Sequence, residues 1–179
     1  MLEYYEKKLF LAELDLNDNI AGKIERWQAH KEGVLHRGFT AVLTYQDNIV
    51  LQHRKHPAFD GCFDLTFSSH QNFIDENLQS DEDAIYEALK REWNIERSEL
   101  VDKPKFLGRI YYKARDPQSV FTEHEIDHIY RIELKNPPTP NLDFAYGFKL
   151  INKLDMKNFK SEISKLKTAP WVDKIVELI

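Results

Sequence analysis

The segment from Cys62 to Ser68 alternates between apolar and polar side chains and continues to a histidine. Phe63, Leu65 and Phe67 occupy one set of positions, and Asp64, Thr66, Ser68 and then His70 occupy the other. Because successive side chains of a strand point to opposite faces, the pattern predicts a strand with one face in the core. A core would not tolerate the polar row, so that face is expected to line a site.

Several other segments have the residue types of β-strands. Residues 9–16 and 20–24 predict an N-terminal hairpin with a polar turn at 17–19, and residues 39–45 and 49–52 predict a second one. Further strands are predicted over 106–113, 126–134 and 144–151. The proline-rich stretch 136–140 can be neither a helix nor a central strand, and it is too short to separate domains.

Three helices are predicted. Ser80-Asp81-Glu82-Asp83 has the form of a helix start, and Ile85, Leu89 and Trp93 then form an apolar stripe. Another helix is predicted over 156–166, and a short terminal one opens at Pro170. A mixed sheet with helices packed on it indicates an α+β fold, an α/β/α sandwich.

The composition narrows the class of protein. A length of 179 residues predicts one domain, 1–179, and a single cysteine excludes disulfide scaffolds and cysteine-based metal clusters. With 25 basic against 30 acidic residues, we expect a small-molecule ligand and no nucleic acid. Charges near the start and the lack of a long apolar run predict a cytoplasmic protein without a membrane segment. The sequence does not indicate an oligomeric state.

Three histidines and two glutamates are candidate metal ligands: His30, His36, His70, Glu123 and Glu125. Two glutamates separated by one residue lie on the same face of a strand. Imidazoles and carboxylates together suit Zn²⁺, Mn²⁺ or Mg²⁺. Histidines are more often surface or hydrogen-bonded core residues, and paired glutamates often mark a solvated edge, so the residue types alone leave both interpretations open.

Six blocks, in order along the chain, carry a family resemblance: Leu35-His36-Arg37-Gly38-Phe39, Val50-Leu51-Gln52-His53-Arg54, Gly61-Cys62-Phe63 followed by Ser69-His70, Arg109-Ile110-Tyr111-Tyr112-Lys113-Ala114, Glu123-His124-Glu125-Ile126-Asp127 and Ala169-Pro170-Trp171. From about residue 29 to 179, and more loosely from residue 9, the chain resembles the type 1 isopentenyl diphosphate isomerases of the Nudix superfamily. The resemblance implies a Nudix-type sandwich with a mixed sheet, an N-terminal hairpin and C-terminal helices.

The resemblance also implies the ligands of the site. The metal, Mg²⁺, Mn²⁺ or Zn²⁺, would be held by the three histidines and two glutamates named above, and Glu92 would hold a second Mg²⁺ on the diphosphate. Arg54, Arg26 and Lys55 would bind the substrate diphosphate, although Arg26 and Lys55 could equally be solvated surface charges. Ala88 falls where some relatives carry an arginine.

The implied reaction moves a double bond by adding one proton and removing another. Glu125, hydrogen-bonded to Tyr112, would be one proton-transfer group, and Trp171 would shelter the carbocation. Ordinary packing is the alternative for both aromatic residues. Relatives carry a cysteine where this chain has Ser68, and Cys62 lies about 20 Å away along the expected strand, too far to replace it.

Three functions follow as alternatives. The first is an active or weakened isopentenyl diphosphate isomerase. The second is a Nudix diphosphohydrolase, although the stretch 87–92 keeps one of the carboxylates expected of such enzymes. The third is a module that binds a metal and a diphosphate without catalysis.

Overall fold

The computed structural model describes residues 2–154 and 156–179. Its elements are α1 (Leu2–Glu6), β1 (Phe10–Leu14), β2 (Ile20–Glu25), α2 (Arg26–Glu32), β3 (His36–Tyr45), β4 (Asn48–Arg54), β5 (Phe63–Asp64), β6 (Phe67–Ser69), β7 (Phe73–Ile74), β8 (Asn77–Leu78), α3 (Asp81–Trp93), the 3₁₀ turn η1 (Arg97–Glu99), β9 (Lys105–Arg115), β10 (Thr122–Leu134), β11 (Ala145–Asn152), α4 (Met156–Ile163) and α5 (Val172–Val176).

Strand β3 is the centre of a mixed sheet. It pairs in parallel with β10, with Glu125 opposite His36, and antiparallel with β1, β4 and β6. Strand β9 pairs with β10, and β11 pairs with β4. Within the described residues this sheet has nine strands, and β7 and β8 form a separate pair. The parallel register brings the start of β3 beside the first half of β10.

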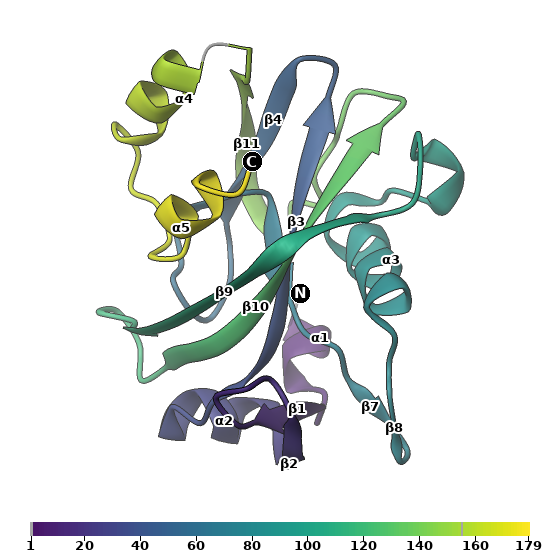
Figure 1. Cartoon of the computed structure of the whole chain (residues 1–179), viewed down its shortest axis with the longest axis vertical. Coiled ribbons are helices and arrows are strands. Elements are labelled where there is room, and N and C mark those ends of the chain that lie inside the picture. The colour runs from purple at the N-terminus through teal and green to yellow at the C-terminus, as the bar shows by residue number, and fades with distance from the viewer. Residues whose placement is uncertain (1, 155) are drawn as a thin grey trace.

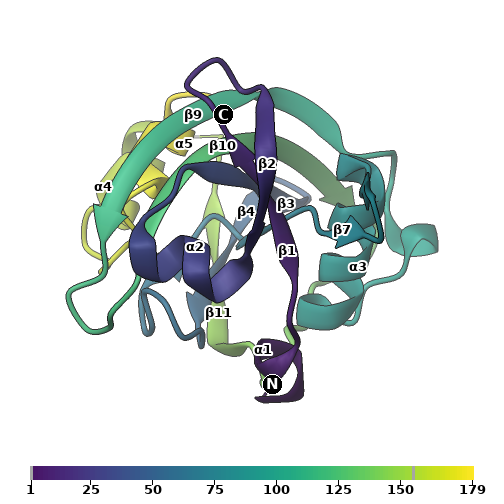
Figure 2. The same cartoon turned by 90° about the horizontal axis from the view of Figure 1, so that it is seen from below.

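Helices cover both faces of the sheet (Figure 1). On one side α3 buries Ile85, Leu89 and Trp93 in an apolar cluster, as the stripe predicts. On the other side α4 and α5 cover a second cluster that includes Phe159 and Trp171. The predicted α/β/α sandwich with a mixed sheet is therefore confirmed. Seen from below in Figure 2, α1, α2 and the β1–β2 hairpin gather around one end of the sheet.

Most of the predicted elements are present. Both hairpins form, as β1–β2 and β3–β4, and the strands predicted at 106–113, 126–134 and 144–151 correspond to β9, β10 and β11. The proline-rich stretch 136–140 belongs to no helix or strand. Ser80 caps α3, its side chain accepting a hydrogen bond from the Asp83 backbone N–H.

The prediction of one continuous strand from Cys62 to Ser68 is wrong. The segment divides into β5, which pairs with β4, and β6, which pairs with β3. Cys62 packs in the apolar cluster beneath α5, away from any polar row. Asp64 and Thr66 are completely buried, so the polar row lines a cavity only at its end, at Ser68 and His70.

The helices differ in part from those predicted. The sequence pattern does not indicate α1 or α2, α4 ends three residues before the predicted 166, and α5 begins two residues after the predicted start at Pro170. Helix α2 ends at Gly33, whose φ of 64° is the left-handed conformation that glycine adopts without strain. No helix in the described part of the chain combines the length and apolarity needed to cross a membrane.

Candidate active site

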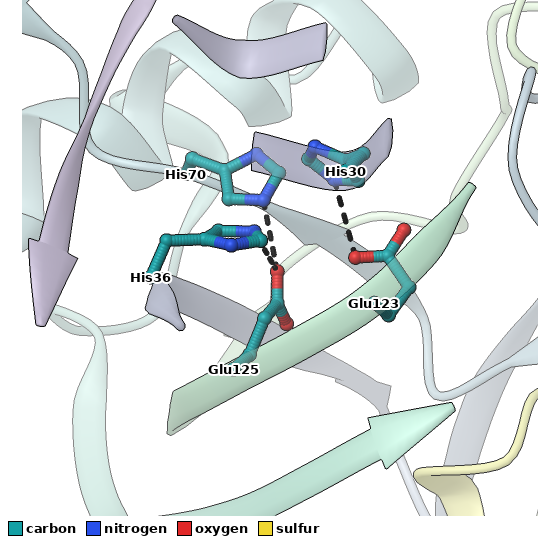
Figure 3. Close-up of side chains that lie close together, drawn as sticks. All are labelled: His30, His36, His70, Glu123 and Glu125. Carbon is teal, nitrogen blue, oxygen red and sulfur yellow. Dashed lines mark hydrogen bonds and ion pairs between the residues drawn. The ribbon is translucent and has the colours of Figure 1, made fainter. Parts of the chain in front are cut away.

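The five candidate metal ligands converge on one point (Figure 3). One ligand atom from each of His30, His36, His70, Glu123 and Glu125 lies within 4.8 Å of all the others. They come from α2, from the start of β3, from the residue after β6, and from β10. The sequence pattern therefore identified a cluster that is assembled from four separate parts of the fold.

The sheet places both carboxylates on one side. Glu123 and Glu125 are separated by one residue on β10, so their side chains point the same way. The parallel register sets His36 directly beside Glu125. Neighbouring Gly38 leaves room for that carboxylate, because a Cβ atom there would lie 2.7 Å from it.

Backbone carbonyls orient two of the imidazoles. Nδ1 of His30 lies 2.7 Å from the Arg26 carbonyl oxygen, and Nδ1 of His36 lies 2.8 Å from that of Val34. An imidazole that donates from Nδ1 presents the Nε2 lone pair on its opposite side. These Nε2 atoms lie 3.2 Å from Glu123 and 3.3 Å from Glu125, in the arrangement that outer hydrogen bonds produce around metal-binding histidines.

The local charges favour ionised glutamates. Burial would raise the pKa of Glu125, but the nearby imidazoles of His36 and His70 hold it well below its usual range. Burial lowers the pKa of His70 to about 4, despite its 2.8 Å hydrogen bond with Glu125. Burial also disfavours the charge on His30, but the Glu123 carboxylate outweighs it and raises the pKa to about 9. Glu123, whose pKa is also lowered, and Glu125 are therefore anionic at neutral pH.

The donor set fits a divalent cation. His36 Nε2 and Glu123 Oε2 are buried and make no hydrogen bond to any described residue. Leaving such atoms unpaired costs free energy, which a bound cation would offset. Three imidazole nitrogens and two carboxylates suit a metal of the Zn²⁺, Mn²⁺ or Mg²⁺ kind.

A cavity opens beside this cluster, and basic side chains line it. Arg26, Arg54 and Arg91 contribute to its wall, together with Tyr4 and Tyr5 of α1. The free space inside this wall is about 50 Å³, which holds a few water molecules. A larger ligand therefore has to displace some of the lining side chains.

The predicted basic residues differ in their surroundings. Arg26 is buried and donates to the carbonyls of Tyr4, Tyr5 and Lys7, and is therefore not a solvated surface charge. Arg54 is buried and pairs with Asp64 at 2.7 Å. Lys55 lies outside the cavity wall and donates to the Leu142 carbonyl.

Glu92 also lines the cavity but lies outside the five-residue cluster. Its carboxylate accepts a 2.9 Å hydrogen bond from Arg91 and lies 3.4 Å from His56 Nε2. Burial would raise the pKa of Glu92, but His56 and Arg91 lower it to about 2. The carboxylate is therefore ionised, and a cation there would compete with these two side chains.

Ser68 belongs to a chain of hydrogen-bonded oxygens. Its Oγ lies 2.8 Å from Thr40 Oγ1 and 3.0 Å from Asp64 Oδ2, and Thr40 Oγ1 lies 2.7 Å from Asp127 Oδ2. The Thr40 hydroxyl donates to Asp127, and the Ser68 hydroxyl donates to Asp64. Burial and the nearby Glu125 raise the pKa of Asp127 well above its usual range. The two hydroxyls therefore link the buried carboxyl groups of Asp127 and Asp64.

The aromatic candidates are packed against each other. The Tyr112 hydroxyl donates a short hydrogen bond to Glu125, and burial together with that carboxylate raises the pKa of Tyr112 well above its usual range. The Trp171 ring stacks on Tyr112 with a centroid separation of 5.2 Å, and Arg54 Cζ lies 5.2 Å from the Trp171 centroid. Both residues line the cavity.

The sequence did not indicate a place in the site for Arg91 or His56, or the pairing of Asp64 with Arg54. Arg91 follows Ala88 by three residues on α3, so helical periodicity could have indicated an alternative arginine on the same face. No sequence signal pointed to His56. Asp64 was assigned to the polar row, but its role as the buried partner of Arg54 depends on the pairing of β5 with β4.

Comparisons with known proteins bear on this site. No family model matches the chain. It is 27% identical over 166 residues to the isopentenyl-diphosphate Delta-isomerase 1 of Photorhabdus laumondii, which covers 90% of this chain and 89% of that protein. The isopentenyl-diphosphate Delta-isomerase 2 of the same organism is 26% identical over 167 residues, 91% of this chain and 88% of that protein.

Solved structures share the fold. A MutT Nudix hydrolase from Burkholderia pseudomallei has a TM-score of 0.57 at 13% identity, covering 81% of this chain and 98% of that one. The Nudix domain of NrtR from Shewanella oneidensis, solved with ADP ribose, has a TM-score of 0.52 at 14% identity, covering 80% and 84%. Together with the sandwich architecture, these likenesses show that the chain has the Nudix fold.

Proposed function

We propose that this protein is a metal-dependent isomerase that converts isopentenyl diphosphate to dimethylallyl diphosphate. One observation carries the proposal: four of the five cluster residues, three arginines and the Tyr112–Glu125 pair line the same cavity. The two isomerases of Photorhabdus laumondii match about nine-tenths of the chain and support it.

The cluster would hold one divalent cation, through His30, His36, His70, Glu123 and Glu125. A bound cation would supply positive charge beside Glu125 and hold that carboxylate in a fixed position. Glu92, which also lines the cavity, is the proposed ligand of a second Mg²⁺ that would arrive with the diphosphate. This role requires Arg91 and His56 to release the carboxylate.

The substrate diphosphate would bind the arginines. Arg26, Arg54 and Arg91 present planar guanidinium groups in the cavity wall, and such groups bind phosphate oxygens in pairs. Arg91 is proposed to supply the contact that Ala88 cannot make. Lys55 lies outside the cavity wall, so this proposal gives it no contact with substrate.

The proton transfers would use groups on the cavity wall. One group adds a proton to the terminal alkene carbon, which leaves a tertiary carbocation, and a second group removes a proton from the carbon on the other side of it. Glu125 with Tyr112 is proposed as one group, and Ser68 as the other. Trp171 is proposed to stabilise the cation, and its contact with the Arg54 guanidinium supports this.

A Nudix diphosphohydrolase is the second candidate, because the structural neighbours named above include a hydrolase. Such hydrolysis uses several carboxylates to hold several metals. On α3, Glu92 lines the cavity, whereas Glu87 is exposed and lies on a different surface. This arrangement favours isomerisation.

Deuterium exchange tests the proposal. The protein is incubated with isopentenyl diphosphate, Mg²⁺ and either Zn²⁺ or Mn²⁺ in D₂O, alongside Ser68→Cys and Ser68→Ala. We expect deuterium in the product with the unaltered chain, faster incorporation with Ser68→Cys and slower incorporation with Ser68→Ala. If neither the unaltered chain nor Ser68→Cys incorporates deuterium, the isomerase proposal is wrong. Release of phosphate from nucleoside diphosphate compounds would then favour the hydrolase.

A further inference from the structure

Asp64 accepts hydrogen bonds from three residues that line the cavity, Arg54, Ser68 and Trp171. The residue is completely buried on β5 and does not itself line the cavity. Its Oδ1 accepts 2.8 Å hydrogen bonds from Trp171 Nε1 and from the Leu65 N–H. Its Oδ2 accepts bonds from Arg54 Nη1 at 2.7 Å and from Ser68 Oγ at 3.0 Å.

All four groups around this carboxylate are donors, so Asp64 acts only as an acceptor. A carboxylate has about four lone-pair sites, and Asp64 uses all of them. Arg54 alone would neutralise its charge. The bonds to Ser68 and Trp171 add geometric control, because they fix a hydroxyl rotamer and the plane of an indole ring.

We propose that Asp64 is a positioning residue that holds Ser68, Trp171 and Arg54 in their working geometry, which rests on the isomerase function proposed above. A serine hydroxyl is a weak proton-transfer group unless a neighbouring base accepts its hydrogen. Asp64 is placed to do this, and the Ser68 oxygen is left to face the cavity and Thr40. The Ser68–Asp64 pair takes the place of a thiol.

The hydrogen bond to Trp171 has a separate effect. It fixes the edge of the indole while Tyr112 stacks against the ring and Phe59 meets it edge-on. An aromatic ring stabilises a cation only over its face, so a rotated ring would lose that interaction. One carboxylate thus sets the orientation of both the proton-transfer group and the aromatic ring.

Asp64→Asn tests the proposal, with Asp116→Asn as the matched control. Asp116 is also a buried acceptor, bonded to Phe59, Gln118 and Ser119, and it lies outside the cavity wall. We expect Asp64→Asn to lower kcat by about 10²-fold or more with a smaller change in KM, and Asp116→Asn to leave both constants within about twofold.

A double-mutant cycle separates positioning from loss of folding. If Asp64 acts through the Ser68 hydroxyl, adding Ser68→Ala to Asp64→Asn lowers kcat much less than Ser68→Ala does alone. Fully additive losses would overturn the proposal. If Asp64→Asn does not fold because Arg54 is left unpaired, Asp64→Glu keeps the charge but shifts the oxygens, and the same loss of kcat is expected.

A spectroscopic readout does not depend on activity. The indole N–H resonance of Trp171 in a ¹H–¹⁵N spectrum should move upfield in Asp64→Asn, because a charge-assisted hydrogen bond is lost, and should stay in place in Asp116→Asn. An unchanged Trp171 resonance in Asp64→Asn would contradict the placement of Asp64. If the unaltered chain and Ser68→Cys both fail to isomerise the substrate, the proposed function is wrong. The Trp171 resonance still tests, independently of activity, whether Asp64 is hydrogen-bonded to Trp171.

Discussion

A carbon atom added at Gly38 would lie 2.7 Å from the carboxylate carbon of Glu125. This distance is well inside van der Waals contact, and both residues lie on paired strands of the central sheet, where the backbone has little freedom to adjust. The position of Glu125 in the cluster therefore depends on the missing side chain at Gly38.

We predict that Gly38→Ala weakens metal binding. The Glu125 carboxylate must move away from His36 and His70, so the affinity for Zn²⁺ in a calorimetric titration should fall by about tenfold or more. Overpacking should also lower the free energy of unfolding by about 1–3 kcal/mol.

Gly22→Ala is the matched control, because the nearest atom to a Cβ there, at 3.3 Å, belongs to the flexible Glu13 side chain. It should keep the affinity for Zn²⁺ close to that of the unaltered chain. Equal affinities for Zn²⁺ in the Gly38 and Gly22 variants would contradict the role assigned to Gly38.

The sequence predicted those parts of the fold in which local pattern and tertiary packing agree. The alternation of Glu123 and Glu125 on a strand, and the spacing of Ile85, Leu89 and Trp93 on a helix, follow from local geometry. Both patterns survive in the structure because the sheet and α3 bury the apolar positions that the periodicity indicates.

The missed features depend on partners far away in the chain. Helix α2 has seven residues and no long apolar stripe, and its place is fixed by contacts of Arg26 and Trp27 with α1. Alternation between residues 62 and 68 does not reveal that β5 and β6 pair with different strands. For the same reason, the burial of Asp64 against Arg54 could not be derived from spacing.

We predict that Arg91→Lys weakens the binding of inorganic pyrophosphate by about tenfold, because lysine keeps the charge but loses the planar pair of donors. The Arg91 guanidinium donates to Ser69 and Glu92 and stacks on Tyr4, so it is held in place at the cavity wall. Titration calorimetry with Mg²⁺ present measures the affinity.

Lys90→Ala is the control for Arg91, because Lys90 is exposed on the same helix and pairs with Glu96 outside the cavity. Its affinity for pyrophosphate should stay within about twofold of that of the unaltered chain. If Arg91→Lys binds pyrophosphate as tightly as Lys90→Ala does, Arg91 is not an anchor for the diphosphate.

Side chains of α1 fill part of the cavity. The Tyr4 and Tyr5 rings lie 4.8 Å and 5.7 Å from Cζ of the Arg26 guanidinium, and the Tyr5 hydroxyl bonds to His56. An anion that uses Arg26 has to displace these contacts. Replacing Tyr4 and Tyr5 by alanine together should therefore tighten pyrophosphate binding severalfold, as measured by the same titration. Weaker binding in this variant would mean that the tyrosines close over the anion instead of competing with it.

At the start of α3, the Asp81 carboxylate accepts hydrogen bonds from Gln71, His128 and Tyr130. Burial would raise the pKa of Asp81, but these bonds outweigh it and lower the pKa from 3.8 to about 2. A carboxyl whose pKa is lower in the folded chain than in the unfolded chain stabilises the fold at pH values above the unfolded-state pKa. This contribution is lost as the pH falls toward 2. Because the side chain is about a third exposed, the contribution at neutral pH is reduced to about 1 kcal/mol.

Asp81→Asn should therefore lower the free energy of unfolding at pH 7 by about 1 kcal/mol, and the difference from the unaltered chain should shrink as the pH falls from 4 toward 2. Urea denaturation at a series of pH values measures it. Glu82→Gln, in the same first turn of the helix, is the control for the loss of one negative charge near the helix dipole. Protonation removes the ionised carboxylate from the unaltered chain at low pH. If the difference in free energy of unfolding between Asp81→Asn and the unaltered chain stays constant down to pH 2, hydrogen bonding to the ionised carboxylate is not the source of that difference.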